Sequence, residues 1–232
     1  MRFVLDPKPG RIGIAQLRLP FAEGDAYRPA EFVVSECNAE AIGEIETWRA
    51  WPVPVLAVIG PAGSGKSHIA RLWAERAGAS VLNPPLGDVE TLPTGPIVVE
   101  DADRVGADVT MFHLLNRVEP DAAVLLTART PPRAWPTALP DLRSRLNALR
   151  FVTVSTPDDA VLGSVLASLL RARHILPDED LIPYLLRRIE RSVDAARRVV
   201  DHLDEAAGTL KREVNRSLAA QVLGASDRAS ET

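Results

Sequence analysis

The sequence predicts an α/β fold with a mostly parallel sheet, followed by a small all-helical domain. Two observations predict it. Within residues 53–155, short apolar runs of strand length alternate with helical segments, as they do in a parallel sheet with helical crossovers. After residue 155, apolar residues recur instead at helical spacing. A chain of 232 residues has room for both parts.

The predicted strands are residues 53–59, 80–82, 96–100, 122–127 and 150–154. In the first part, helices are expected at residues 38–51, 66–77 and 110–118, and in the second part at 156–173, 178–188, 192–207 and 215–223. Thr156, followed by a proline and two aspartates, is expected to cap the first helix of the second part. The predicted organisation is an arm (1–26), an α/β domain (27–155), a helical domain (156–223) and a frayed tail (224–232).

Composition limits the classes of function. The net charge is -4, which gives no support to a reader of duplex DNA, since such proteins usually present a basic face. The one cysteine, Cys37, allows no intramolecular disulfide, and no apolar run reaches membrane-spanning length. No secretory signal precedes residue 20. We therefore expect a soluble, cytoplasmic protein without direct sequence-specific DNA binding.

A phosphate-binding loop follows the first predicted strand and opens the next helix. The loop consists of Gly60, Pro61, Ala62, Gly63, Ser64, Gly65, Lys66 and Ser67, which fit the pattern G-x-x-x-x-G-K-[ST]. Its backbone N–H groups can surround the phosphates, while the Lys66 ammonium can reach the β and γ oxygens. The Ser67 hydroxyl can ligate Mg²⁺. The pattern predicts binding of ADP or ATP with Mg²⁺, and we include the next residue, His68, in the expected site.

A second element of the expected site is an apolar strand that ends in carboxylates. Ile97-Val-Val-Glu100-Asp101 has this form, and Glu100 or Asp101 can hold Mg²⁺ and orient a water molecule. An acidic turn after a strand is common, so this element alone does not indicate a magnesium site. It does so here because the phosphate loop is present in the same chain. The four histidines show no spacing of metal ligands, and no metal other than Mg²⁺ on the nucleotide is expected.

Taken together, these residues resemble the AAA+ ATPases, and more narrowly the DnaA-related ones. The resemblance includes Leu125-Leu-Thr127 at a strand end, Asp141-Leu-Arg-Ser-Arg-Leu146 before the last strand, and the helical domain as a lid. It implies that Thr127 is the first sensor of the nucleotide and that Arg145 is an arginine finger acting on a neighbouring subunit. A solvated arginine at a helix end is the alternative for Arg145. The resemblance covers roughly residues 14–223.

The chain is most similar to regulators of the Hda/HdaA type, which inactivate the replication initiator DnaA. No residues remain after the lid for the DNA-binding domain of DnaA, and Gln16-Leu-Arg-Leu-Pro-Phe21 is similar to a sliding-clamp-binding motif. In an extended segment, Leu17 and Leu19 project to one side and can enter an apolar groove with Phe21, while Gln16 fixes the register and Pro20 continues the motif. From the residues alone, packing of this segment as an edge strand is equally possible.

Three positions depart from the pattern of the resembled family. Glu100 stands where an aspartate is usual, and Arg129 stands two residues after Thr127 in place of an aspartate. The family's second-sensor arginine in the lid aligns with Asp194, whose carboxylate would repel a γ-phosphate. Either Arg197 or Arg191 therefore takes the role of that arginine, or the site prefers ADP. The adenine pocket is assigned to Phe32 and Val33, with core packing as the alternative for both.

The function implied by the resemblance is negative regulation of replication initiation. The expected protein holds ADP, has weak or no ATPase activity of its own, and binds the sliding clamp (the β subunit of DNA polymerase III). It would then stimulate hydrolysis of DnaA-bound ATP, with homo-oligomers as an open possibility. A DnaC-like helicase loader would need a basic groove with stacking aromatics, but aromatic residues make up only 5% of the chain. A small-molecule P-loop kinase would not require the helical second domain.

Overall fold

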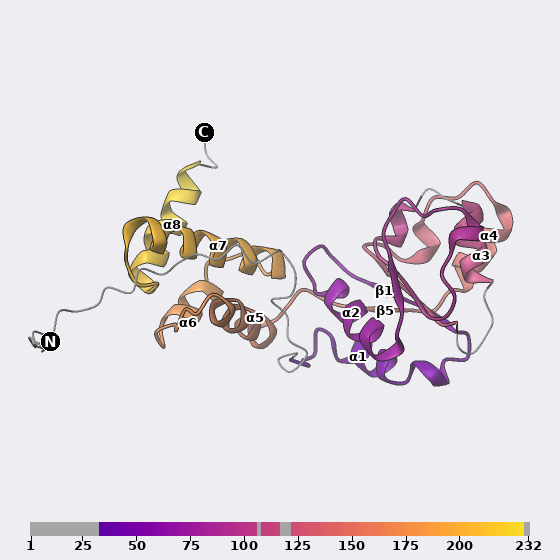
Figure 1. Cartoon of the computed structure of the whole chain (residues 1–232), viewed down its shortest axis with the longest axis horizontal. Coiled ribbons are helices and arrows are strands. Elements are labelled where there is room, and N and C mark those ends of the chain that lie inside the picture. The colour runs from indigo at the N-terminus through magenta and orange to yellow at the C-terminus, as the bar shows by residue number, and fades with distance from the viewer. Residues whose placement is uncertain (1–32, 106–107, 117–121, 230–232) are drawn as a thin grey trace, which may run out of the picture.

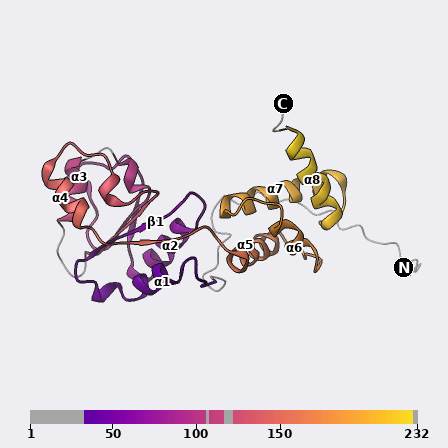
Figure 2. The same ribbon diagram turned by 180° about the vertical axis from the view of Figure 1, so that it is seen from behind.

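The computed structural model describes residues 33–105, 108–116 and 122–229. A sheet with helices on both faces forms one part of the molecule, and helices α5–α8 form the other part (Figures 1 and 2). An extended segment after β5 joins them (Figure 1). Among the helices of these ranges, none combines the length and the apolar composition that a bilayer span requires.

The sheet contains five parallel strands in the order β2-β3-β4-β1-β5. They are β1 (Val55–Ile59), β2 (Ser80–Leu82), β3 (Ile97–Val99), β4 (Val124–Ala128) and β5 (Phe151–Thr153). Every residue of β1, β3 and β4 is buried, because helices cover both faces of the sheet. The five strands predicted by the sequence are all present. Since all strands run in one direction, their carboxyl ends share one edge of the sheet.

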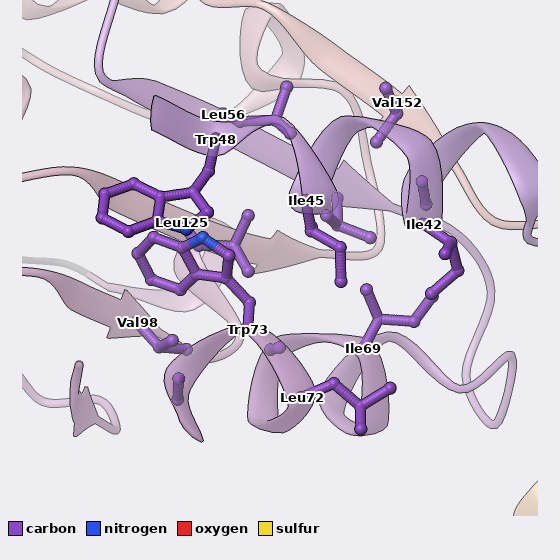
Figure 3. Close-up of a cluster of buried hydrophobic side chains, with 14 of the residues drawn as sticks. Ile42, Ile45, Trp48, Leu56, Ile69, Leu72, Trp73, Val98, Leu125 and Val152 are labelled. Carbon is purple, nitrogen blue, oxygen red and sulfur yellow. The ribbon is translucent and has the colours of Figure 1, made fainter. Parts of the chain in front are cut away.

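Helices α1 (Ala39–Glu46) and α2 (Lys66–Ala77) cover one face of this sheet. Trp73 of α2 is fully buried there, edge-to-face with Trp48 at 5.8 Å between ring centroids and stacked on Trp51 at 5.9 Å. Figure 3 shows Trp48 and Trp73 side by side among Leu56, Val98 and Leu125 of the strands. Aromatic packing of this kind fixes α2, and α2 begins at the phosphate loop.

The single helix predicted over residues 38–51 is wrong in its second half. The α-helix stops at Glu46, and a 3₁₀ turn, η2 (Trp48–Ala50), follows. Thr47 causes the break: its hydroxyl donates to the Gly43 carbonyl at 3.1 Å, which its backbone N–H would bond in a continuing α-helix. That N–H donates to the Glu44 carbonyl instead, at 3.2 Å.

The opposite face of the sheet is covered by α3 (Asp108–Leu115) and α4 (Pro140–Ala148). Three 3₁₀ turns lie in the connections, namely η3 (Val89–Thr91), η4 (Ala102–Arg104) and η5 (Pro132–Ala134). Helix α4 starts with a proline, which suits the first helical position, and buries Leu142 and Leu146.

The helical part consists of α5 (Asp159–Ala172), α6 (Leu181–Leu186), α7 (Val193–Leu210) and α8 (Arg216–Ala229), with a leucine-rich core of its own. Asp158, not Thr156, caps α5 by accepting from the Val161 N–H at 2.9 Å. Helix α8 continues past residue 223, where the sequence was expected to fray, to Ala229.

Candidate nucleotide-binding site

The phosphate loop lies between the carboxyl end of β1 and the amino end of α2. Gly60 sits so close to the strand end of β5 that a Cβ atom would be 2.2 Å from the Val154 carbonyl oxygen. Its N–H donates to the Ala128 carbonyl of β4 at 3.2 Å. Residues from three neighbouring strands thus hold the first residue of the loop, and a side chain there has no room.

Lys66 is the buried cation of the loop, with 7% of its surface exposed. Its ammonium donates to the Pro61 carbonyl at 2.7 Å, so it lies across the loop. Burial lowers the pKa of Lys66, and the Arg129 guanidinium lowers it further. The carboxylates of Asp101, Glu100 and Asp103 act in the opposite direction, Asp101 most strongly. The ammonium therefore lies within the field of all three acids.

One carboxylate oxygen gathers the polar residues that the sequence assigned to metal binding and sensing. Glu100 Oε2 accepts from the Ser67 hydroxyl at 3.0 Å and from the Thr127 hydroxyl at 2.5 Å. Thr127 Oγ1 in turn accepts from the Asp101 N–H at 3.1 Å. Hard oxygen ligands suit Mg²⁺, so Ser67 and Glu100 fit a magnesium ion carried by the nucleotide.

Asp101 differs from its neighbour Glu100 in its contacts. Its backbone is left-handed (φ 45°), and its carboxylate lies 3.9 Å from the Arg104 guanidinium. The backbone N–H of Asp101 contacts Thr127, while its side chain belongs to no hydrogen bond of the Glu100 group among the described residues. Glu100 is the acid positioned on the Ser67 and Thr127 hydroxyls, and Asp101 acts on Lys66 through its charge.

The helical part contacts the phosphate loop directly at the start of α7. The Val193 N–H donates to the Gly63 carbonyl at 2.9 Å. Gly63 has φ 69°, and a Cβ atom on it would lie 2.6 Å from the Ser192 Cβ, so a glycine is needed for this approach. Ser192 is buried and caps α7 through its hydroxyl, which accepts from the Ala195 N–H at 3.1 Å. A nucleotide in the loop would therefore lie next to the lid.

A narrow cavity of about 30 Å³ lies beside the loop, between α2, α5 and the start of α7. Its walls combine apolar and small polar side chains, namely Val33, Asn38, Ser64, Gly65, His68, Ile69, Val161, Ser164, Val165 and Val193. The sequence assigned Val33 and His68 to the nucleotide site, and both are here; Phe32 lies outside the described residues.

Several wall residues were not found from the sequence because they come from distant parts of the chain. From the sequence, Asn38 was expected only as the start of a helix, and the structure shows that it is buried there. Its side chain donates to the Val33 carbonyl at 3.0 Å and accepts from the Ser35 N–H at 2.9 Å. Asn38 thereby holds the segment before α1 against the cavity.

His68 gives the site a testable pH dependence. Burial, followed by the Arg71 charge, lowers its pKa from 6.5 to about 4. Between these values the unfolded chain binds more protons than the folded one, so acidification from about pH 6.5 to 4 opposes folding. Acidification should therefore lower the free energy of unfolding of the wild type, and we expect His68→Asn to reduce this decrease by about 1–2 kcal/mol. The figure is discounted because water reaches part of the ring. Urea unfolding at pH 7 and pH 5 measures it; the same change at exposed His202 should leave the pH dependence unaltered.

The two arginines that the sequence offered in place of the second sensor are both exposed in the helical part. Asp194 is exposed in the first turn of α7. Arg191 pairs with Asp159 at 2.8 Å. Arg197, which the sequence assigned to the nucleotide site, is exposed, is not in the cavity wall and makes no ion pair with the rest of the described chain. Among the described residues, neither Asp194 nor these two arginines lines that cavity, and the group that takes the place of the second sensor stays a prediction.

Arg145 lies on α4, on the face of the sheet opposite to α2. Its side chain is exposed and makes no hydrogen bond or ion pair with any of the described residues. Its neighbour Arg143 behaves differently, since it donates to the Arg133 carbonyl at 2.9 Å and to the Trp135 carbonyl at 2.6 Å. Arg143 is a structural residue, whereas Arg145 is available to a partner. The segment Gln16, Leu17, Leu19, Pro20 and Phe21 lies outside the described residues.

Comparison with solved structures identifies the fold. No protein-family model matches the sequence. The structure is similar to domain III of the replication initiation protein DnaA from Thermotoga maritima, with a TM-score of 0.70 at 16% identity over 84% of this chain and 94% of that one. The RuvB Holliday junction branch migration motor of the same organism gives 0.65 at 14% identity, covering 83% of this chain and 70% of that one. A DNA replication initiation factor gives 0.62 at 16%, covering 77% and 64%. The protein has a DnaA-like AAA+ P-loop NTPase fold.

Proposed function

We propose that the protein is a nucleotide-bound AAA+ adaptor that binds the DNA polymerase sliding clamp and stimulates hydrolysis of DnaA-bound ATP. Negative regulation of replication initiation is the consequence. The observation that carries the proposal is the contrast between the two arginine positions of the fold. By the resemblance, Asp194 stands at the lid position from which other family members direct an arginine at their own nucleotide, while Arg145 is exposed on α4 and makes no hydrogen bond or ion pair with the described residues.

The first step is nucleotide binding at the phosphate loop. Lys66 supplies the cation, the N-terminal end of α2 supplies backbone N–H groups, and Ser67 with Glu100 fits Mg²⁺. ADP is the form we favour. A carboxylate at Asp194 adds repulsion to a third phosphate, and the second-sensor position then holds no arginine that would distinguish ATP. Bound ADP would then act mainly as a structural ligand between the sheet and the lid.

The second step is catalysis in trans. An arginine finger stabilises the charge that develops during phosphoryl transfer, and it must reach the phosphates of a neighbouring molecule. Arg145 meets the structural requirements, since it is exposed and its helix is anchored by the buried Leu142 and Leu146. The DnaA-like fold supports DnaA as the neighbour, because AAA+ domains of similar shape can pack as subunits of one assembly. The chemistry then occurs on the nucleotide of DnaA.

A reconstituted hydrolysis assay tests this function. The full chain is mixed with ATP-loaded DnaA, clamp loaded on DNA, and ADP, and the conversion of DnaA-bound ATP to ADP is followed. We expect fast conversion only when all components are present. Unchanged conversion in the complete mixture would contradict the proposal. The same mixture with Lys66→Ala should be slow, because that variant lacks the cation that holds ADP.

Clamp binding is expected to depend on the N-terminal motif. Replacing Leu17 and Leu19 together by alanine should weaken binding to the clamp by about 100-fold or more, since two buried leucine side chains are lost from the groove. Surface plasmon resonance on immobilised clamp measures it. Leu176→Ala is a matched control, because Leu176 is 88% exposed and lies in the helical part. Equal binding by the double variant and the control would show that the motif is not the clamp ligand.

A further inference from the structure

The loop after β4 brings a second arginine to the edge of the sheet where the phosphate loop begins. Residues Ile59 and Ala128 are partners in the β1–β4 register, and the Gly60 N–H donates to the Ala128 carbonyl. The next residue after Ala128 is Arg129. The backbone that carries Arg129 is therefore hydrogen-bonded to the first residue of the phosphate loop.

The backbone of Arg129 is also held from the acidic side of the site. Its N–H donates to Asp103 Oδ2 at 2.9 Å, and the Thr130 hydroxyl reaches the same oxygen at 3.5 Å. Asp103 lies in η4, directly after the Glu100–Asp101 pair. The loop is thus tied to two elements of the nucleotide site, β1 through Gly60 and the acidic turn through Asp103. The backbone of Arg129 therefore has a fixed position relative to the phosphate loop.

The side chain of Arg129, in contrast, is exposed and has no hydrogen bond or ion pair within the part of the chain that the structure describes. Arg129 follows β4 and Lys66 follows β1, the strand paired with β4, so both cations lie at the carboxyl edge of the sheet. The same edge carries the phosphate loop, whose N–H groups and helix end also favour an anion.

We propose that Arg129 binds the terminal phosphates of the nucleotide and supplies the cation that the lid lacks at Asp194. A guanidinium can donate two parallel hydrogen bonds to phosphate oxygens, which a solvated lysine does less well. The position two residues after Thr127 brings this group to the phosphates from the sheet, so the site keeps a cation there without using the lid. The ligand class is a nucleoside diphosphate or triphosphate with Mg²⁺.

This inference rests on the nucleotide binding proposed above, and one titration tests both. Fluorescent analogues of ADP and ATP are titrated with Mg²⁺ into the full wild-type chain and into Arg129→Ala, Arg129→Lys and Arg133→Ala. The last variant is the matched control, because Arg133 is an exposed arginine of the following turn. Thermal melts without nucleotide check that each variant is folded.

We expect Arg129→Ala to bind about 10- to 100-fold more weakly than wild type, as for loss of a charge-assisted contact. Arg129→Lys should recover part of the affinity, and Arg133→Ala should bind as wild type does. If folded Arg129→Ala binds the nucleotides with the same affinity as the wild type, the role of Arg129 is overturned, whereas nucleotide binding by the protein stands. Equal weakening by Arg133→Ala would also overturn it, since the effect would then be one of general charge. If the wild type binds neither nucleotide, the proposed function fails as well.

Discussion

Replacing Arg145 with alanine is expected to slow the stimulated hydrolysis of DnaA-bound ATP by about 10³-fold or more, the range in which arginine fingers act. The reason is that the guanidinium meets the transition-state charge directly, and no neighbouring arginine can take its place. Arg143 is committed to the carbonyls of Arg133 and Trp135. The measurement is the rate of ATP conversion on DnaA in the reconstituted mixture.

The same variant should retain its fold, its ADP affinity and its clamp binding. Arg145 is exposed and makes no hydrogen bond or ion pair with the described residues, so its removal leaves α4 packed through Leu142 and Leu146. Arg187→Ala is a suitable control, because it removes an exposed arginine from the end of α6. Normal stimulation by Arg145→Ala would refute the trans mechanism. A joint loss of clamp binding and stimulation would point to misfolding, which a thermal melt detects.

Two glycine-to-alanine substitutions are expected to change stability in opposite directions. Gly60→Ala should lower the free energy of unfolding by about 2–3 kcal/mol, because its Cβ atom would meet the Val154 carbonyl, a backbone atom that cannot rotate away. Gly43→Ala should raise it by about 0.5–1 kcal/mol, because Gly43 lies in α1 with nothing within 4 Å of the added methyl group. Urea unfolding of both variants without nucleotide measures the difference.

The glycine pair also separates local geometry from nucleotide binding. Gly60→Ala displaces the start of the phosphate loop from β4 and β5, so its ADP affinity should fall together with its stability. Gly43→Ala leaves the loop untouched, and its affinity should stay at the wild-type value. If Gly60→Ala is as stable as wild type, the close approach to Val154 does not exist in solution.

The sequence predicted the sheet well because its three central strands, β3, β4 and β1, are buried on both faces. Such strands are continuous apolar runs, for example residues 97–99 and 124–126, and they need no alternation to be recognised. The phosphate loop was equally legible, since its geometry depends on glycines at fixed positions. Parallel strands also imply that residues at their carboxyl ends meet, which brought Ser67, Glu100 and Thr127 together as expected.

What the sequence left open depends on contacts between distant segments or on single hydrogen bonds. The Thr47 hydroxyl ends α1 by taking one carbonyl, and no periodicity records that. Glu100 and Asp101 are adjacent acids, and only the left-handed backbone of Asp101 separates their roles. The contact of Val193 with Gly63 joins two domains and has no local signal. The arm and Phe32 remain predictions.

The seating of α7 on the phosphate loop has a mechanical consequence. Helix α7 has 18 residues, so it forms a rigid rod about 27 Å long. The N–H of its first residue, Val193, donates a hydrogen bond to the Gly63 carbonyl, so the helix can pivot about the phosphate loop. A rotation of about 10° at this end would carry the Leu210 end through about 5 Å. A change of a few tenths of an ångström around a phosphate could thus be amplified into a displacement that a bound partner would sense.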